Sequence, residues 1–147
     1  MIYSQDDRVF MRSLATRGQA GGLSPSTKRC LEILVNSGLF EVILLETVGT
    51  GQEAIPFGVE TLPVDRAVLV MSPEYGSRLQ LQKIAMIDAA DIIVVNKSDW
   101  QGSRTALAEI ESRIRTNRKE QTLLRTQANR HADAGVDRLF RLLFGEE

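Results

Sequence analysis

Three polar side chains that follow an apolar run have the types and spacing needed to recognise a guanine base. Asn96, Lys97 and Asp99 occur in the order Asn-Lys-x-Asp directly after residues 91–95. An aspartate can accept hydrogen bonds from both N1–H and the exocyclic amine of guanine, while a lysine stem lies along the base. Adenine offers no matching donors, so it would leave the carboxylate buried and unpaired. The motif predicts a guanine-binding loop, although a solvated polar turn has the same composition.

A second candidate site follows the apolar run at residues 41–45. Glu46 stands three residues before Gly49 in the stretch ETVGTGQ at residues 46–52. Nucleotide hydrolysis needs an acid near the magnesium ion, usually through its water, and a glycine whose backbone N–H can approach the terminal phosphate. Glu46 and Gly49 are therefore candidate catalytic residues, with Glu46 an indirect ligand of Mg²⁺. Taken alone, the pattern favours an ordinary glycine turn after a strand.

A third loop could complete the base site. Gln127 and Ala128 follow the last apolar run of strand length, where a loop could supply a backbone N–H to the base. The composition of this loop carries little weight on its own. Trp100 directly follows the guanine motif, and it either shields the base or covers the next helix.

These loops need strands that end at the same edge of a sheet. Apolar runs alternate with segments of helical period, which is typical of an α/β protein whose mostly parallel sheet is flanked by helices. Ligands of such sheets gather at the carboxyl ends of the strands, where the loops of Glu46 and Asn96 both fall. The predicted strands are residues 10–14, which form the weakest candidate, 41–45, 66–71, 91–95 and 121–126.

Four helices are predicted between and after these strands. The first begins with Ser24 as N-cap and Pro25 at the first helical position, and it ends at Gly38. The second spans residues 78–89, and the third spans 104–118 with Ser103 as its cap. Apolar side chains at helical spacing predict the buried faces of the first, third and last helices. They are Cys30, Leu31, Leu34 and Val35; Leu107, Ile110 and Ile114; and Val136, Leu139, Phe140, Leu143 and Phe144.

Length and composition agree with one soluble globular domain over residues 1–147. The chain is 43% hydrophobic and 25% charged, with a formal net charge of -1. Basic and acidic residues are interspersed, so the positive stripe expected of a nucleic-acid binder is absent. No apolar run has membrane-spanning length, and the first residues lack the order of a signal peptide. We therefore expect a cytoplasmic protein that binds neither nucleic acid nor membranes.

Several stretches together resemble the G domain of the G-protein chaperones that serve adenosylcobalamin-dependent acyl-CoA mutases. This family comprises the methylmalonyl-CoA mutase-associated GTPases of the ArgK/MeaB type, and the resemblance runs nearly end to end. The chain is most similar to the version fused within isobutyryl-CoA mutase. The stretches are FMRSLATR at residues 10–17, ETVGTGQ at 46–52, MSPEYG at 71–76 and DAADIIVVNKSD at 88–99.

The resemblance implies a SIMIBI-type P-loop GTPase fold and a set of functional residues. It implies GTP or GDP with Mg²⁺ as ligand, a mutase as partner and no cobalamin bound directly by this chain. Residues 73–83 would correspond to a switch that relays the nucleotide state to the mutase. The implied roles are Glu46 near magnesium, Gly49 at the terminal phosphate, Asn96, Lys97 and Asp99 on guanine, and Gln127 and Ala128 as further base contacts.

The sequence departs from the family by lacking the phosphate-binding loop. No Gly-x-x-x-x-Gly-Lys-Ser/Thr occurs in it, so we expect a partial G domain that is truncated at the N-terminus before the Walker A segment. Because phosphoryl transfer depends on positioning and electrostatic stabilisation, intrinsic hydrolysis should be weak or absent. An exposed sheet edge should favour a homodimer or a complementing P-loop segment. The alternative is a non-catalytic interaction module that binds the mutase or a complementing chain.

Overall fold

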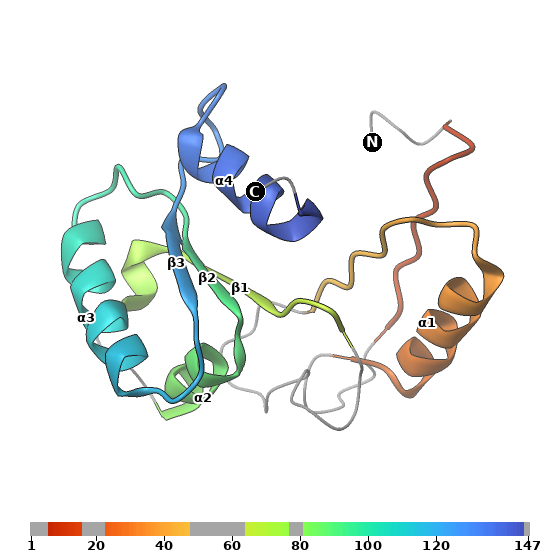
Figure 1. Cartoon of the computed structure of the whole chain (residues 1–147), viewed down its shortest axis with the longest axis horizontal. Coiled ribbons are helices and arrows are strands. Elements are labelled where there is room, and N and C mark those ends of the chain that lie inside the picture. The colour runs from red at the N-terminus through yellow and green to blue at the C-terminus, as the bar shows by residue number, and fades with distance from the viewer. Residues whose placement is uncertain (1–5, 16–22, 48–63, 77–80, 146–147) are drawn as a thin grey trace. The chain divides into compact units, whose positions relative to one another are not determined.

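The computed structural model describes residues 6–15, 23–47, 64–76 and 81–145. The chain divides into two units, Met1–Pro56 and Phe57–Glu147, and each is described by itself. All the strands assigned to the described residues lie in the second unit, together with helices α2, α3 and α4 (Figure 1). The second unit therefore positions the predicted guanine loop.

The first unit contains helix α1, Pro25–Ser37, whose two ends follow the sequence prediction. Ser24 precedes the helix in an extended conformation, and its N–H donates to Thr27 Oγ1 at 3.1 Å. Gly38 ends the helix with a φ of 61°, which is the left-handed region that favours glycine. The prediction of a buried stripe is wrong for Val35, which is 60% exposed, whereas its apolar neighbours on the stripe are half-buried.

The two strands predicted in the first unit, residues 10–14 and 41–45, are not formed. These residues make no ladder hydrogen bonds within the described part of the unit, and Phe10 and Leu44 are 58% and 84% exposed. A parallel strand needs a neighbouring strand and cover on both faces. Among its described residues the unit supplies α1 but no strand partner, so apolar composition alone does not produce a strand here.

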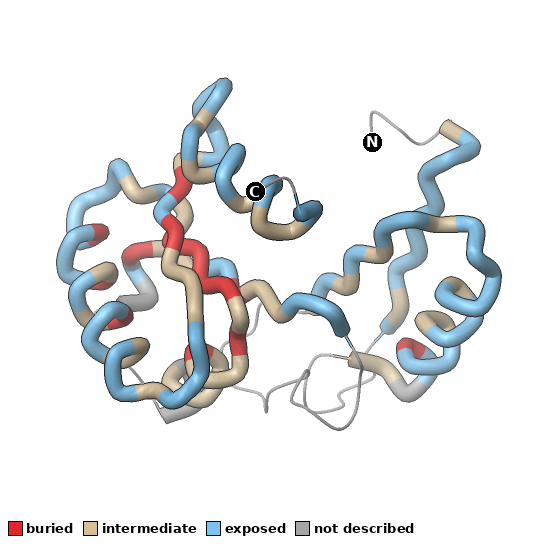
Figure 2. Tube along the Cα trace, in the orientation of Figure 1, coloured by how far each residue is buried: buried red, intermediate tan, exposed pale blue. Residues whose placement is uncertain are grey.

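The second unit is built on a parallel sheet in the order β1-β2-β3. The strands are β1, Val68–Met71, β2, Ile92–Val95, and β3, Thr122–Arg125. Their register pairs the last residues of all three strands, so the loops that follow them begin at one edge. All four residues of β2 are buried (Figure 2), as expected of a central strand covered on both faces. The predicted strands at 66–71, 91–95 and 121–126 and the parallel α/β architecture are confirmed.

Helices cover both faces of this sheet. Helices α2, Leu81–Ala89, and α3, Ser103–Thr116, lie on one face, and α4, Ala134–Phe144, lies on the other (Figure 1). Alternate strand residues point to each side, which gives two apolar clusters. The first cluster is built on Leu69, Ile87, Ala90, Ile93, Val95 and Ile110, and the second on Ile92, Val94 and Leu124.

Helix α3 begins one residue earlier than predicted, because its N-cap is Gly102 and not Ser103. Gly102 has a φ of 90°, a backbone conformation that residues other than glycine rarely adopt. Ser103 becomes the first helical residue and is buried. The predicted apolar face is confirmed, since Leu107, Ile110 and Ile114 belong to the core cluster between α3 and the sheet. For the second predicted helix, residues 78–80 lie outside the described part of the chain.

Helix α4 docks on the sheet as predicted, but only part of its predicted face is covered. Leu139 and Leu143 pack against the second cluster, and Leu142 joins them. Val136, Phe140 and Phe144 are 38%, 52% and 43% exposed, so the prediction that they are buried is wrong. No helix in the described ranges has the length and apolar character needed to cross a membrane.

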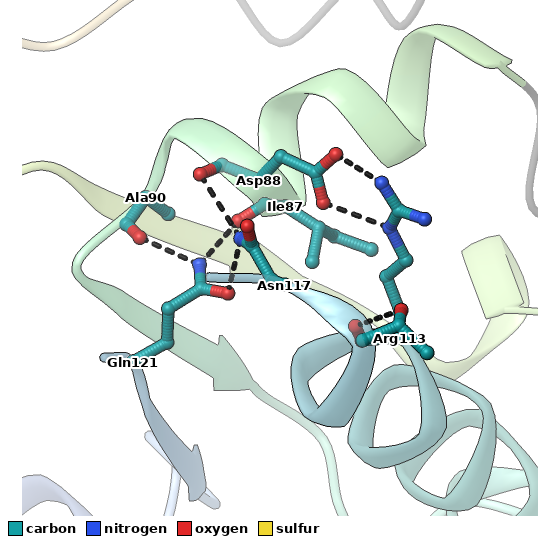
Figure 3. Close-up of polar contacts among 7 residues, drawn as sticks. Ile87, Asp88, Ala90, Arg113, Asn117 and Gln121 are labelled. Atoms are coloured by element: carbon teal, nitrogen blue, oxygen red, sulfur yellow. Dashed lines mark hydrogen bonds and ion pairs between the residues drawn. The ribbon is translucent and has the colours of Figure 1, made fainter. Parts of the chain in front are cut away.

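Side chains from the end of α3 and the turn before β3 bind the last turn of α2 (Figure 3). Gln121 Nε2 donates to the carbonyl oxygens of Ile87 at 2.5 Å and Ala90 at 2.7 Å, and Gln121 Oε1 accepts from Asn117 Nδ2 at 2.8 Å. Arg113 pairs with Asp88 through two N–H groups. Because a helix end leaves carbonyl groups without partners, these contacts fix where α2 stops and where β3 begins.

Asp91 joins the beginnings of β1 and β2. Its carboxylate accepts from the Ala67 N–H at 2.7 Å and lies 2.8 Å from Lys119 Nζ. Burial by itself would raise the pKa of Asp91, but the Ala67 N–H and the Lys119 ammonium outweigh burial and lower the pKa below its ordinary value of 3.8. Asp91 is therefore ionised at neutral pH and holds the end of the sheet opposite to the predicted base site.

Candidate base-binding site

The loops after β2 and β3 are held to the sheet and to each other by backbone hydrogen bonds. The Asn96 N–H donates to the Met71 carbonyl at 2.8 Å, and the Thr126 N–H donates to the Val95 carbonyl at 3.0 Å. The Ser98 N–H then crosses to the Thr126 carbonyl at 3.1 Å. The ladder thus continues one residue past each strand, which gives the guanine motif a rigid base.

The Asn96 side chain connects the two loops directly. Its Oδ1 accepts from Thr126 Oγ1 and from the Ala128 N–H, both at 3.0 Å. A carbonyl oxygen has two lone pairs, and these two hydrogen bonds use both of them. Because the Ala128 N–H needs an acceptor, the oxygen and not the nitrogen of the Asn96 amide must face Ala128. Thr126 is 3% exposed, and burial makes the loss of such a bond costly. Within the described part of the chain, Asn96 Nδ2 makes no hydrogen bond.

Gln127 and Ala128 lie beside the motif, as the sequence predicted for a third loop. The Ala128 N–H is used by Asn96, whereas the Gln127 N–H has no partner among the described residues. Gln127 is half-buried and Ala128 is exposed. Of these two backbone donors, the one on Gln127 is not used within the described residues. Contact with a base stays a prediction for both residues.

Lys97 and Asp99 occupy the exposed part of the loop. Lys97 has a φ of 56°, and the Trp100 N–H donates to its carbonyl at 3.0 Å, which closes a tight turn. The Lys97 ammonium lies 4.3 Å from the centroid of the Trp100 ring. The Asp99 carboxylate is exposed and, over the ranges that the structure describes, no other side chain bonds it. Its oxygens are therefore free to accept the two donors of a guanine edge.

The loop after β3 is also held in place by the start of α4. Asp133 is the N-cap of this helix, and its Oδ1 accepts from the Val136 N–H at 3.0 Å. Gly135 lies so close to the end of β3 that a Cβ at this position would stand 2.0 Å from the Arg125 carbonyl oxygen. Glycine is needed here because the helix start approaches the strand backbone.

The predicted phosphate and magnesium residues, Glu46 and Gly49, belong to the other unit of the chain, not to the unit that carries the base loop. Glu46 is exposed and belongs to the first unit, and Gly49 lies outside the described residues. No three acidic, histidine or cysteine side chains cluster as metal ligands in the part that is described. The donors and acceptors of the second unit lie on two loops that are hydrogen-bonded to each other.

Two contacts of the motif were not predicted from the sequence: the hydrogen bond from Thr126 to Asn96 and the contact between Lys97 and Trp100. A hydroxyl residue at the end of the strand next to the guanine motif was the available signal for Thr126, since polar residues at neighbouring strand ends meet at one edge. For the contact between Lys97 and Trp100, the available signal was that the tryptophan directly follows the guanine motif. Both contacts involve side chains of the Asn-Lys-x-Asp motif.

A parallel sheet with helices on both faces and an Asn-Lys-x-Asp loop at its carboxyl edge is typical of the α/β fold of P-loop GTPases. Residues 2–142 match the family of methylmalonyl-CoA mutase-associated GTPases, MeaB. The chain belongs to this family, which confirms the resemblance inferred from the motifs.

Curated relatives share the family but are much longer. The fused isobutyryl-CoA mutase of Paraburkholderia xenovorans is 36% identical over 144 residues, which cover 91% of this chain and 11% of that protein. The fused isobutyryl-CoA mutase of Geobacillus kaustophilus is 34% identical, with coverage of 90% and 12%. The mitochondrial methylmalonic aciduria type A homolog of Mus musculus is 33% identical, with coverage of 86% and 30%. The chain thus spans less than a third of the length of each of these relatives.

Proposed function

We propose that this chain binds guanine nucleotides as part of a GTPase-family chaperone for an adenosylcobalamin-dependent acyl-CoA mutase. The observation that carries the proposal is the joined pair of loops, in which Asn96 accepts from both Thr126 and Ala128. This arrangement holds the loop that bears Lys97 and Asp99 in one conformation before a base arrives. A preorganised site loses less entropy on binding than a mobile one.

The base contacts follow from the chemistry of the groups present. Asp99 accepts from N1–H and the exocyclic amine of guanine, the Lys97 stem covers one face of the base, and Asn96 Nδ2 donates to a ring acceptor. The Gln127 and Ala128 loop closes the site from the side. Adenine would place an acceptor and no amine against the carboxylate, so guanine is preferred by hydrogen bonding and not by size.

Phosphate binding and hydrolysis are proposed to be weak in this chain. The sequence has no Gly-x-x-x-x-Gly-Lys-Ser/Thr to surround the phosphates with N–H groups and to place a hydroxyl on Mg²⁺. Glu46, through water on Mg²⁺, and Gly49, at the terminal phosphate, would act only together with such a loop. Nucleotide affinity therefore comes mainly from the base, and turnover requires a complementing P-loop segment.

An acyl-CoA mutase is the proposed partner. Several relatives are named as fused isobutyryl-CoA mutases, and the family itself is named for association with methylmalonyl-CoA mutase. A domain that is joined to an enzyme in one protein commonly contacts that enzyme when the two are separate chains. Cobalamin would be bound by the mutase and not by this chain.

A non-catalytic interaction module is the second candidate, and the edge position of β1 in the sheet favours it. Strand β1 is an edge of the sheet, and its Val70 is 60% exposed. An open edge of this kind pairs with another chain. In this reading the fold binds the mutase, a second copy or a complementing chain, and the guanine loop is only an inherited feature.

Titration of the 147-residue chain with GTP, GDP and ATP in the presence of Mg²⁺ separates the two candidates. Calorimetry should give binding of GTP and GDP but not of ATP, and a synthetic phosphate-loop segment should raise the affinity. Turnover without that segment should be near background. The absence of guanine nucleotide binding at millimolar concentration, with retained binding to a mutase in gel filtration, would support the interaction module instead.

A further inference from the structure

The contact between Lys97 and Trp100 is a feature of the loop that base recognition by Asp99 does not require. The ammonium of Lys97 lies 4.3 Å from the centroid of the Trp100 ring, within the range of a cation–π interaction. Trp100 is 42% exposed, so it is not simply a core residue. The exposed part of the ring is accessible to the side chains of the predicted guanine motif that precedes it.

The backbone explains why this contact forms. Lys97 is in the left-handed region, with a φ of 56°, and the Trp100 N–H closes the turn by donating to its carbonyl. The Trp100 carbonyl in turn accepts from the N–H of Ser103, the first residue of α3, at 3.2 Å. Trp100 is therefore held between the motif and a packed helix, which places its ring within reach of the Lys97 ammonium.

We infer that Trp100 is a positioning residue of the base site, which holds the Lys97 ammonium so that the lysine stem is ready to cover a purine. The inference rests on the proposed guanine binding. A lysine side chain free in solvent has many rotamers, and fixing it on binding costs free energy. The Trp100 ring restricts those rotamers before the base arrives. Trp100 thus acts through Lys97 and does not itself contact the base.

The size of the effect is bounded by the strength of an exposed cation–π contact. Such contacts are worth about 0.5–1 kcal/mol, which corresponds to a roughly two- to fivefold change in a dissociation constant. Trp100→Leu should weaken GDP binding by this factor, and Trp100→Phe should restore part of the affinity because it keeps an aromatic face. The matched control Phe140→Leu, on α4 and 52% exposed, should leave GDP binding unchanged.

A double-mutant cycle with Lys97→Met tests whether Trp100 acts through Lys97. GDP affinity is measured by calorimetry for the wild-type chain, Trp100→Leu, Lys97→Met and the double variant. The inference predicts that Trp100→Leu has no further effect once Lys97 is replaced. Additive losses would overturn it, because Trp100 would then contact the base itself. An unchanged affinity in Trp100→Leu would overturn it as well, while leaving guanine binding by the wild-type chain intact.

A readout without nucleotide tests the contact itself. In the free chain, the ring current of Trp100 should move the NMR signals of the Lys97 side-chain CH₂ groups upfield, and Trp100→Leu should abolish that shift. Normal lysine shifts in the wild-type chain would contradict the inference. Failure of the proposed function looks different, because the wild-type chain would then bind no GDP although the lysine signals are shifted.

Discussion

The side-chain oxygen of Asn96 accepts a hydrogen bond at 3.0 Å from the backbone N–H of Ala128, which lies 32 residues further along the chain. The same oxygen accepts from the hydroxyl of Thr126 at the end of β3. One side chain thus joins the loops that follow two neighbouring strands. The predicted base loop is organised by this connection and not by the local sequence alone.

Replacing Asn96 should loosen both loops. Asn96→Ala removes the acceptor of the Thr126 hydroxyl and of the Ala128 N–H, so the free energy of unfolding should fall by about 1–3 kcal/mol. Urea denaturation followed by circular dichroism measures this change. Asn129→Ala, at an exposed asparagine nearby, is the matched control and should stay within about 0.5 kcal/mol of the wild-type chain. Equal stability of the Asn96 variant and this control would show that the connection is not needed.

Asp99→Asn should exchange the base preference. The asparagine amide offers one acceptor and one donor, which suits the N1–H and 2-carbonyl of xanthine but not the two donors of guanine. Since hydrogen bonds to a charged group are worth about 1.5–3 kcal/mol, GDP should bind about 10- to 100-fold more weakly, and XDP should bind more tightly than GDP. Calorimetric titration of both nucleotides measures the exchange, with Asp137→Asn on α4 as control. A parallel loss for GDP and XDP would argue against direct contact between Asp99 and the base.

Gly135→Ala should disturb the join between β3 and α4. The added Cβ would stand 2.0 Å from the Arg125 carbonyl oxygen, so the helix start must move away, at a cost of about 1–3 kcal/mol in unfolding free energy. Gly145→Ala is a useful comparison because nothing lies within 4 Å of its Cβ position, and only its φ of 74° makes alanine unfavourable. Thermal melts should show the larger loss for the Gly135 variant, and the reverse order would contradict the close approach.

Acid should weaken the second unit partly through Asp91. Its pKa is lower in the folded chain than the ordinary value of 3.8, so its contribution to stability is complete above that pH and is lost as the pH falls through the folded pKa. The contribution should stay below about 1 kcal/mol, because the Asp91 and Lys119 side chains are 35% and 39% exposed. Urea denaturation between pH 2 and 7 should give a shallower acid loss for Asp91→Asn than for the wild-type chain. Equal acid losses in the Asp91 variant and the wild-type chain would contradict a stabilising role of the Asp91 carboxylate.

The sheet of the second unit could be predicted because its strands are continuous apolar runs, which indicate burial. The continuous apolar run of β2 is explained by the helices that cover both faces of the strand, and the polar residues of the next loop indicate where the strand ends. The run at residues 41–45 has a similar composition but forms no strand in the described structure, since a strand also needs a neighbour. Apolar composition indicates that a segment tends to be buried. It does not indicate whether a neighbouring strand is present to pair with that segment.

The details of the site depend on contacts between distant residues. The Asn96 oxygen and the Thr126 hydroxyl lie 30 positions apart, and no local pattern records their pairing. The same holds for Gln121, whose amide binds carbonyl groups 31 and 34 residues earlier. Polar side chains have many possible partners, so their pairing follows only from the folded arrangement. Motif chemistry therefore identified Asn96 but not the bonds that orient it.

The most direct test of guanine recognition is the ratio of the dissociation constants of GDP and ADP for the 147-residue chain. The two ligands carry the same phosphates and sugar, so any difference in affinity comes from the base. Pairing of the Asp99 carboxylate with the two guanine donors predicts that GDP binds at least about 100-fold more tightly than ADP in calorimetric competition. Equal affinities for GDP and ADP, or binding of neither, would contradict it.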